Sequence, residues 1–166
     1  QQTGLIVQDG PRRWRILAVL CVSLFVIVMD NTIVNVALPS LARKLEAGTS
    51  SLQWIVDAYT LVFAGLLLAA GGLGDRFGRK GALLGGLGIF AIGLLLAGLG
   101  DTATQVIGGR AVMGVGSAFV MPATLSLITA VFPPEERGRA IAVWAGFAGA
   151  GGAIGPVVAG ALLESF

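Results

Sequence analysis

The sequence lacks histidine altogether, has a single cysteine, Cys21, and only 12% of its residues are charged. Without histidine there is neither a histidine proton relay nor a histidine-ligated metal site, so proton chemistry near neutral pH falls to carboxylates. One cysteine excludes an internal disulfide. The net charge of +2 is small, and the basic residues do not form the stripe of a nucleic-acid-binding protein. We therefore expect no metal, no cofactor and no nucleic-acid partner.

Apolar residues and glycine make up most of the sequence. Hydrophobic residues account for 55% of the chain and glycine for 26 of 166 residues, and the mean hydropathy is +0.88. Small residues allow close packing of helices in a membrane. Each of the long apolar runs can cross a hydrocarbon core of about 30 Å. The runs are Ile16–Pro39, Leu52–Leu73, Gly81–Gly100, Thr104–Phe132 and Ala140–Leu163.

The sequence thus predicts an all-α, polytopic membrane protein. Residues 1–15 are expected to form a cytoplasmic segment, and residues 16–166 to form five transmembrane helices. Lys and Arg accumulate on one side of the predicted spans, which places the N-terminus in the cytoplasm. Because the chain does not begin with Met and ends two residues after Glu164, we interpret it as a fragment of a longer protein.

Three ionisable residues lie inside the apolar runs, where charge is costly and often marks a functional site. At 1.5 Å per residue, Asp30 lies roughly 9 Å from the outer edge of the hydrocarbon core, Asp57 about 8 Å and Arg110 about 9 Å. They are therefore expected to share one layer. Either they form a structural ion pair, or an aspartate exchanges protons, because burial favours the neutral carboxyl and a guanidinium favours the carboxylate.

Polar residues extend this site along the first run. Ser23 lies seven residues before Asp30 and so on nearly the same helical face, while Asn31 and Asn35 share a neighbouring face. These side chains predict a polar strip that faces the bundle interior. The strip is compatible with a substrate or proton route and equally with hydrogen bonding between helices.

Between the second and third runs lies GGLGDRFGRK. Asp75 is expected just before the third helix, where the helix dipole favours an acid. The element GLGD occurs at Gly72–Asp75 and again at Gly98–Asp101, and it resembles a motif of intramembrane aspartyl proteases. However, Asp75 and Asp101 are expected on opposite sides of the membrane, which argues against an enzyme.

The fifth run is rich in glycine. Gly151 and Gly155 form a GxxxG pattern, and Pro156 and Gly160 follow it. The pattern predicts either static tight packing or a surface that slides or bends during a conformational change. Before this run, the segment PPEE predicts a separate short helix at the cytoplasmic surface.

The order and spacing of these motifs resemble the N-terminal part of a major facilitator superfamily transporter, within the fourteen-span drug:proton antiporters. DNTIVNVALP resembles the first-helix motif of those antiporters, and RAVMGVG the fourth-helix motif, with Met113 at a position that is commonly Gln. GAIGPVVAG resembles the fifth-helix antiporter motif, with Ala159 in place of its usual glycine. GGLGDRFGRK resembles the superfamily's loop signature, which covers Gly71, Leu73, Asp75, Arg76, Gly78, Arg79 and Lys80.

The resemblance implies alternating access and proton-coupled efflux of hydrophobic or cationic drug-like compounds by the longer protein. It assigns proton coupling and recognition of cationic drugs to Asp30, Asp57 and Arg110. The polar strip adds Asn31 and Asn35 as candidate residues of the same site. It assigns a cytoplasmic latch to Asp75 and Arg79, and the interface between halves to the fifth helix. The implied partners are the lipid bilayer, a lipophilic small molecule, protons and the remaining helices. A non-transporting module that binds or senses a ligand, and a facilitator for another small solute, stay open as alternatives.

Overall fold

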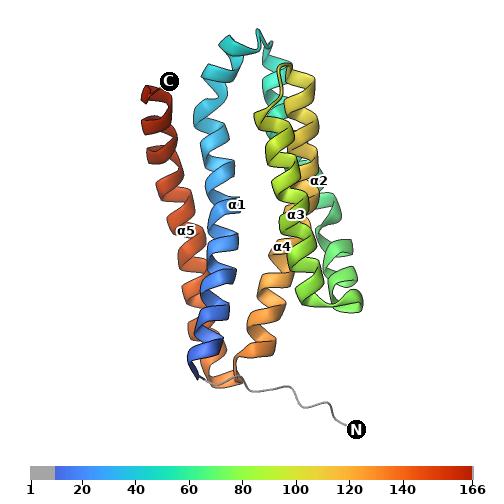
Figure 1. The fold of residues 1–166 in the computed structure, drawn as a ribbon, viewed down its shortest axis with the longest axis vertical. Coiled ribbons are helices and arrows are strands. Elements are labelled where there is room, and N and C mark those ends of the chain that lie inside the picture. Colours follow the sequence, from blue (N-terminus) through green and yellow to red (C-terminus); the bar gives the residue numbers. More distant parts are fainter. Residues whose placement is uncertain (1–9, 166) are drawn as a thin grey trace.

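The structure, a computed structural model, describes residues 10–165, and these form five α-helices (Figure 1). All five are long and apolar enough to cross a membrane, which confirms the predicted fold class. Their bounds are α1 Gly10–Lys44, α2 Thr49–Phe77, α3 Arg79–Gly98, α4 Ala103–Val131 and α5 Pro134–Ser165.

Two local predictions about helix ends were wrong. Asp75 lies in the last turn of α2 rather than before α3, because α2 continues to Phe77. Only Gly78, with a φ of +106°, separates the two helices, and glycine adopts this backbone conformation readily. The PPEE segment is no separate helix: α5 starts at Pro134 and continues unbroken, since proline is well tolerated in the first helical turn.

The helices form two groups that pack side by side. α1 lies along α5, whereas α2, α3 and α4 form a second cluster (Figure 1). α4 packs extensively against both α2 and α3, and its interface with α1 is much smaller. A narrow seam between α1 and α4, with similarly small contacts of α4 with α5 and of α1 with α2, therefore joins the two groups.

Glycines set the spacing within each group. In the second group, a Cβ atom on Gly116 would lie 2.5 Å from the backbone nitrogen of Phe90, and one on Gly93 would lie 2.6 Å from that of Met113. Between α5 and α1, Gly151 has the carbonyl oxygen of Phe25 only 3.0 Å from the position of such a Cβ. Helix backbones approach this closely only where there is no side chain.

At the end of the bundle that holds the start of α1, charged and aromatic side chains join three helices. Arg13 forms an ion pair of 3.0 Å with Glu136 of α5. The Trp14 ring meets the ring of Phe132 edge to face, with centroids 5.4 Å apart, and the Arg139 guanidinium lies 5.4 Å from the Trp14 ring centroid. These contacts tie the start of α1 to the α4–α5 connection.

Candidate functional site

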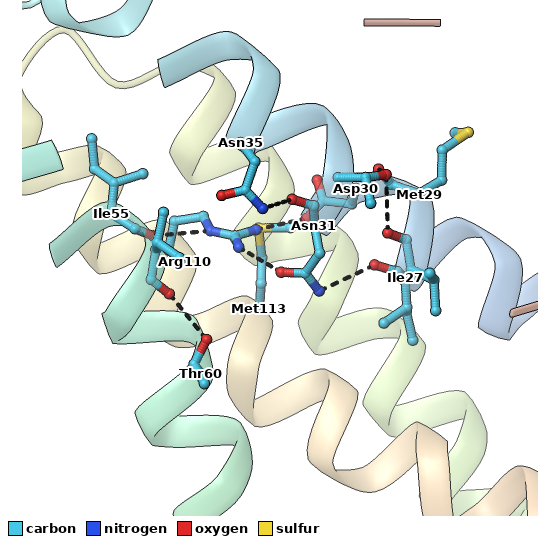
Figure 2. Close-up of polar contacts among 12 residues, drawn as sticks. Ile27, Met29, Asp30, Asn31, Asn35, Ile55, Thr60, Arg110 and Met113 are labelled. Carbon is cyan, nitrogen blue, oxygen red and sulfur yellow. Dashed lines mark hydrogen bonds and ion pairs between the residues drawn. The ribbon is translucent and has the colours of Figure 1, made fainter. Parts of the chain in front are cut away.

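Arg110 is the centre of a buried polar cluster at the seam between the helix groups. Its side chain is 2% exposed. Nη1 donates to Oδ2 of Asp30 at 2.6 Å, and Nη2 donates to Oδ1 of Asn31 at 2.9 Å. Nε donates to the carbonyl oxygen of Ile55 at 3.2 Å. One guanidinium on α4 therefore binds α1 through two side chains and α2 through its backbone (Figure 2).

Two further side chains surround the guanidinium. Its central carbon lies 4.5 Å from the centroid of the Tyr59 ring, a distance at which a cation is attracted by an aromatic face. Nη1 also lies 3.9 Å from the sulfur of Met113, one turn along α4. Because a thioether is only a weak acceptor, Met113 adds little beyond packing.

The ion pair between Asp30 and Arg110 is nearly closed to water. The Asp30 side chain is 14% exposed, compared with 2% for Arg110. Removal of one partner from such a pair leaves an uncompensated buried charge, which is strongly unfavourable. Of the two partners, the Asp30 carboxylate is therefore the more exposed.

Asp57 stands apart from this cluster. It follows Ile55 by two residues and precedes Tyr59 by two, so it lies at the level of Arg110, as the depth estimate expected. Its side chain is nevertheless exposed, and in the described part of the chain it forms no ion pair. The shared layer therefore contains one paired carboxylate and one carboxylate on an open face of α2.

In the polar strip along α1, Asn31 is the residue that hydrogen-bonds to another helix. Ser23 is buried and donates to the carbonyl oxygen of Val19 at 2.8 Å. Asn35 is exposed and donates to the backbone of Asn31 at 3.0 Å. Asn31 Oδ1 accepts from Arg110 of α4, while its amide nitrogen donates to the carbonyl oxygen of Ile27 in its own helix (Figure 2).

The residues of the α2–α3 loop signature contact α4 near its C-terminal end. Nε of Arg79 lies 3.2 Å from Oδ1 of Asp75, and Nη1 of Arg79 donates to the carbonyl oxygen of Ser126 at 3.1 Å. The Ser126 hydroxyl donates to the same Asp75 oxygen at 3.4 Å. Arg76 and Lys80 are exposed. The predicted latch residues thus form a small network that anchors the loop to α4.

Of the glycine motif on α5, two residues face the helix that carries Asp30. A Cβ atom on Gly155 would clash with the Thr32 hydroxyl, whereas Gly160 has open space and Pro156 is exposed. The motif thus packs tightly on α1 at Gly155. Gly155 of α5 faces Thr32 and the Met29 carbonyl oxygen of α1, which lie within two residues of Asp30.

Sequence reasoning missed two contacts of the site, the Ile55 carbonyl and the Tyr59 ring. Tyr59 is the only tyrosine in the sequence, and the depth estimate that placed Asp57 level with Arg110 applied equally to it. A search for aromatic rings at the depth of Arg110 would therefore have found it.

Comparison with known proteins agrees with this architecture. The sequence pattern of the Major Facilitator Superfamily matches residues 20–166. The multidrug efflux pump LfrA of Mycolicibacterium smegmatis is 46% identical over 165 residues, which cover 99% of this chain and 33% of that protein. The methyl viologen resistance protein SmvA of Salmonella typhimurium is 39% identical over 156 residues, covering 93% and 32% respectively. The chain thus spans about a third of the length of these relatives.

A solved structure shows the same fold. The inward-facing, occupied structure of a bacterial homologue of the human lysosomal transporter Spinster superimposes with a TM-score of 0.84 at 22% identity. The superposition covers 93% of this chain and 33% of that one. By its match to the family's sequence pattern over residues 20–166, the chain belongs to the Major Facilitator Superfamily, a family of transporters rather than of enzymes.

Proposed function

We propose that this chain is part of a longer transporter that exports hydrophobic or cationic drug-like compounds in exchange for protons. The observation that carries the proposal is the 2.6 Å ion pair between Asp30 and Arg110, which bridges the two helix groups. Its two charges come from separate groups of helices. Relative movement of these groups therefore changes the environment of the carboxylate.

Proton exchange follows from that movement. When α1 lies against α4, Arg110 stabilises the Asp30 carboxylate. When α1 moves away, the carboxylate loses its counter-ion within an apolar bundle, and protonation removes the cost of the unpaired charge. Arg110 keeps its charge throughout and acts as the fixed partner. One cycle of separation and return thus takes up and releases a proton at Asp30.

Asp57 serves substrate recognition in this proposal. Its carboxylate is exposed on α2 at the level of the ion pair, and Asn35 of α1 is exposed as well. An unpaired carboxylate attracts organic cations, and one relative is a resistance protein for methyl viologen, a dication. The network of Asp75, Arg79 and Ser126 is then the latch on the Lys- and Arg-rich side, which we place in the cytoplasm.

The test uses the full-length protein that the gene encodes, in inverted membrane vesicles. Proton movement is followed with a pH-sensitive dye while a cationic substrate such as methyl viologen is added. Asp30→Asn and Asp57→Asn are expected to abolish substrate-driven proton movement. Asp101→Asn is the matched control, because Asp101 is an exposed acid in the α3–α4 connection.

Each alternative predicts a different outcome. Full exchange in both Asp30→Asn and Asp57→Asn would contradict the proposal. Substrate transport without proton movement in the unsubstituted protein would indicate a facilitator, and binding without transport would indicate a sensing module.

A further inference from the structure

Tyr59 lies directly beneath the charge at the centre of the site. It is 5% exposed, and its ring centroid is 4.5 Å from the Arg110 guanidinium. The Phe63 ring, one turn further along α2, is parallel to it within 6°, with centroids 6.0 Å apart. The side chains of Asn31 and Ser117 lie near the Tyr59 hydroxyl. The ring is therefore fixed on several sides, and it presents its face to a cation.

We propose that Tyr59 is a positioning residue for Arg110. With the Ile55 carbonyl, its ring holds the guanidinium on the α2–α4 unit after Asp30 has moved away. The inference rests on the proposed proton exchange at Asp30, and it adds a role for a neutral aromatic residue that touches neither the proton nor the substrate.

The contacts of Arg110 divide by helix, which is the first support for this role. α1 supplies Asp30 and Asn31, whereas α2 supplies Ile55 and Tyr59. Ile55 and Tyr59 are four residues apart and so share one helical face. A displacement of α1 alone removes the first pair of contacts and leaves the second intact.

The spacing between α2 and α4 is the second support, because it cannot easily change. Gly114 lies one turn after Arg110, and a Cβ atom there would be 2.7 Å from the Tyr59 carbonyl oxygen. Backbones in such contact move together, so the Tyr59 ring follows α4 and stays beside the guanidinium. Without the ring, a buried guanidinium that has lost Asp30 and Asn31 would keep only the Ile55 carbonyl and the weakly accepting Met113 sulfur as polar partners among the described residues.

Ring electrostatics can be tested apart from ring size. Phenylalanine and its mono-, di- and trifluoro derivatives are incorporated at position 59 of the full-length protein. Fluorine withdraws charge from the ring face while changing the ring volume little. Tyr59→Phe is expected to retain exchange, and the rate of proton-coupled exchange is expected to fall stepwise with each fluorine, by about tenfold in total.

Phe63 provides the matched control. It packs on Tyr59 in the same helix, and within residues 10–165 no cation lies over its ring. The same fluorinated series at position 63 is expected to leave the rate unchanged. Melting temperature in detergent is measured for every variant, so that a folding defect is separated from a loss of positioning.

A flat response to fluorine at position 59, equal to that at position 63, would overturn the positioning role and leave Tyr59 as a packing residue. Asp30→Asn is measured in the same vesicles. If it stops exchange while the series at position 59 is flat, only this inference fails. If Asp30→Asn exchanges normally, the proposed proton role itself fails.

Discussion

Two adjacent glycines of α4 allow a direct test of the packing that holds Arg110. Gly109 faces α3: a Cβ atom there would lie 2.5 Å from the backbone nitrogen of Ala97 and 2.8 Å from its Cα. Gly108 is exposed and has no neighbouring atom within 4 Å of such a Cβ. We predict opposite effects of the same methyl group at these two positions.

The expected difference follows from the distances. Ordinary contact begins at 3.4 Å, so Gly109→Ala requires the α3 and α4 backbones to separate by about 1 Å, and overpacking typically costs about 1–3 kcal/mol. Gly108→Ala meets no obstacle, and both substitutions gain the same helix propensity, up to about 1 kcal/mol, because both positions lie inside α4. The two variants should therefore differ by the overpacking cost, about 1–3 kcal/mol, which corresponds to a melting-temperature difference of about 2–12 °C in a chain of this size.

The assay is thermal unfolding of both variants in the same detergent, followed by circular dichroism. Gly109→Ala should melt well below the unsubstituted protein, and Gly108→Ala at or above it. Equal melting temperatures for the two variants would show that α3 and α4 are not in backbone contact at this level. The close packing on which the fixed position of Arg110 depends would then be refuted.

Two further predictions concern the other interfaces. Gly155→Ala should lower the melting temperature through its clash with Thr32 of α1, and Gly160→Ala, in open space, should not; equal values would contradict direct α1–α5 contact. Arg79→Ala should slow exchange in the full-length protein because the contact with Ser126 is lost. Its melting temperature should change little, since an exposed pair contributes at most about 1 kcal/mol, and unchanged exchange would argue against a latch.

The number and type of the helices could be predicted because long apolar runs have few alternatives in a membrane. Their ends could not, since hydropathy measures only the apolar part of a helix. α1 continues through Pro39 to Lys44, and α5 begins before its apolar run at Pro134. Both extensions are rich in polar and charged residues, which form helix while adding little hydrophobicity.

The sequence predicted the depth of the site residues in the membrane, but not the direction in which each side chain points from its helix. Rise per residue places Asp30, Asp57 and Arg110 at one level, but depth says nothing of the angle around a helix. At about 100° per residue, Asp57 lies on the opposite side of α2 from both Ile55 and Tyr59, which face Arg110. Tyr59 was not predicted for a different reason. Burial of a neutral ring in an apolar bundle has little free-energy cost, so its presence there does not indicate an electrostatic role.

The position of the ion pair explains why the glycines and the charges belong to one arrangement. Gly109 and Gly116 allow close contact of α4 with α3, and Gly114 allows close contact with α2. Arg110 therefore lies on a helix that is packed closely on two sides. On the other side of the seam, Gly155 allows α5 to pack closely on the α1 turn that contains Asp30. Between these two units, the smaller α1–α4 interface contains the ion pair. A shift of one unit against the other therefore strains the ion pair before it disturbs either glycine-packed interface, which is what a proton-exchanging carboxylate requires of its surroundings.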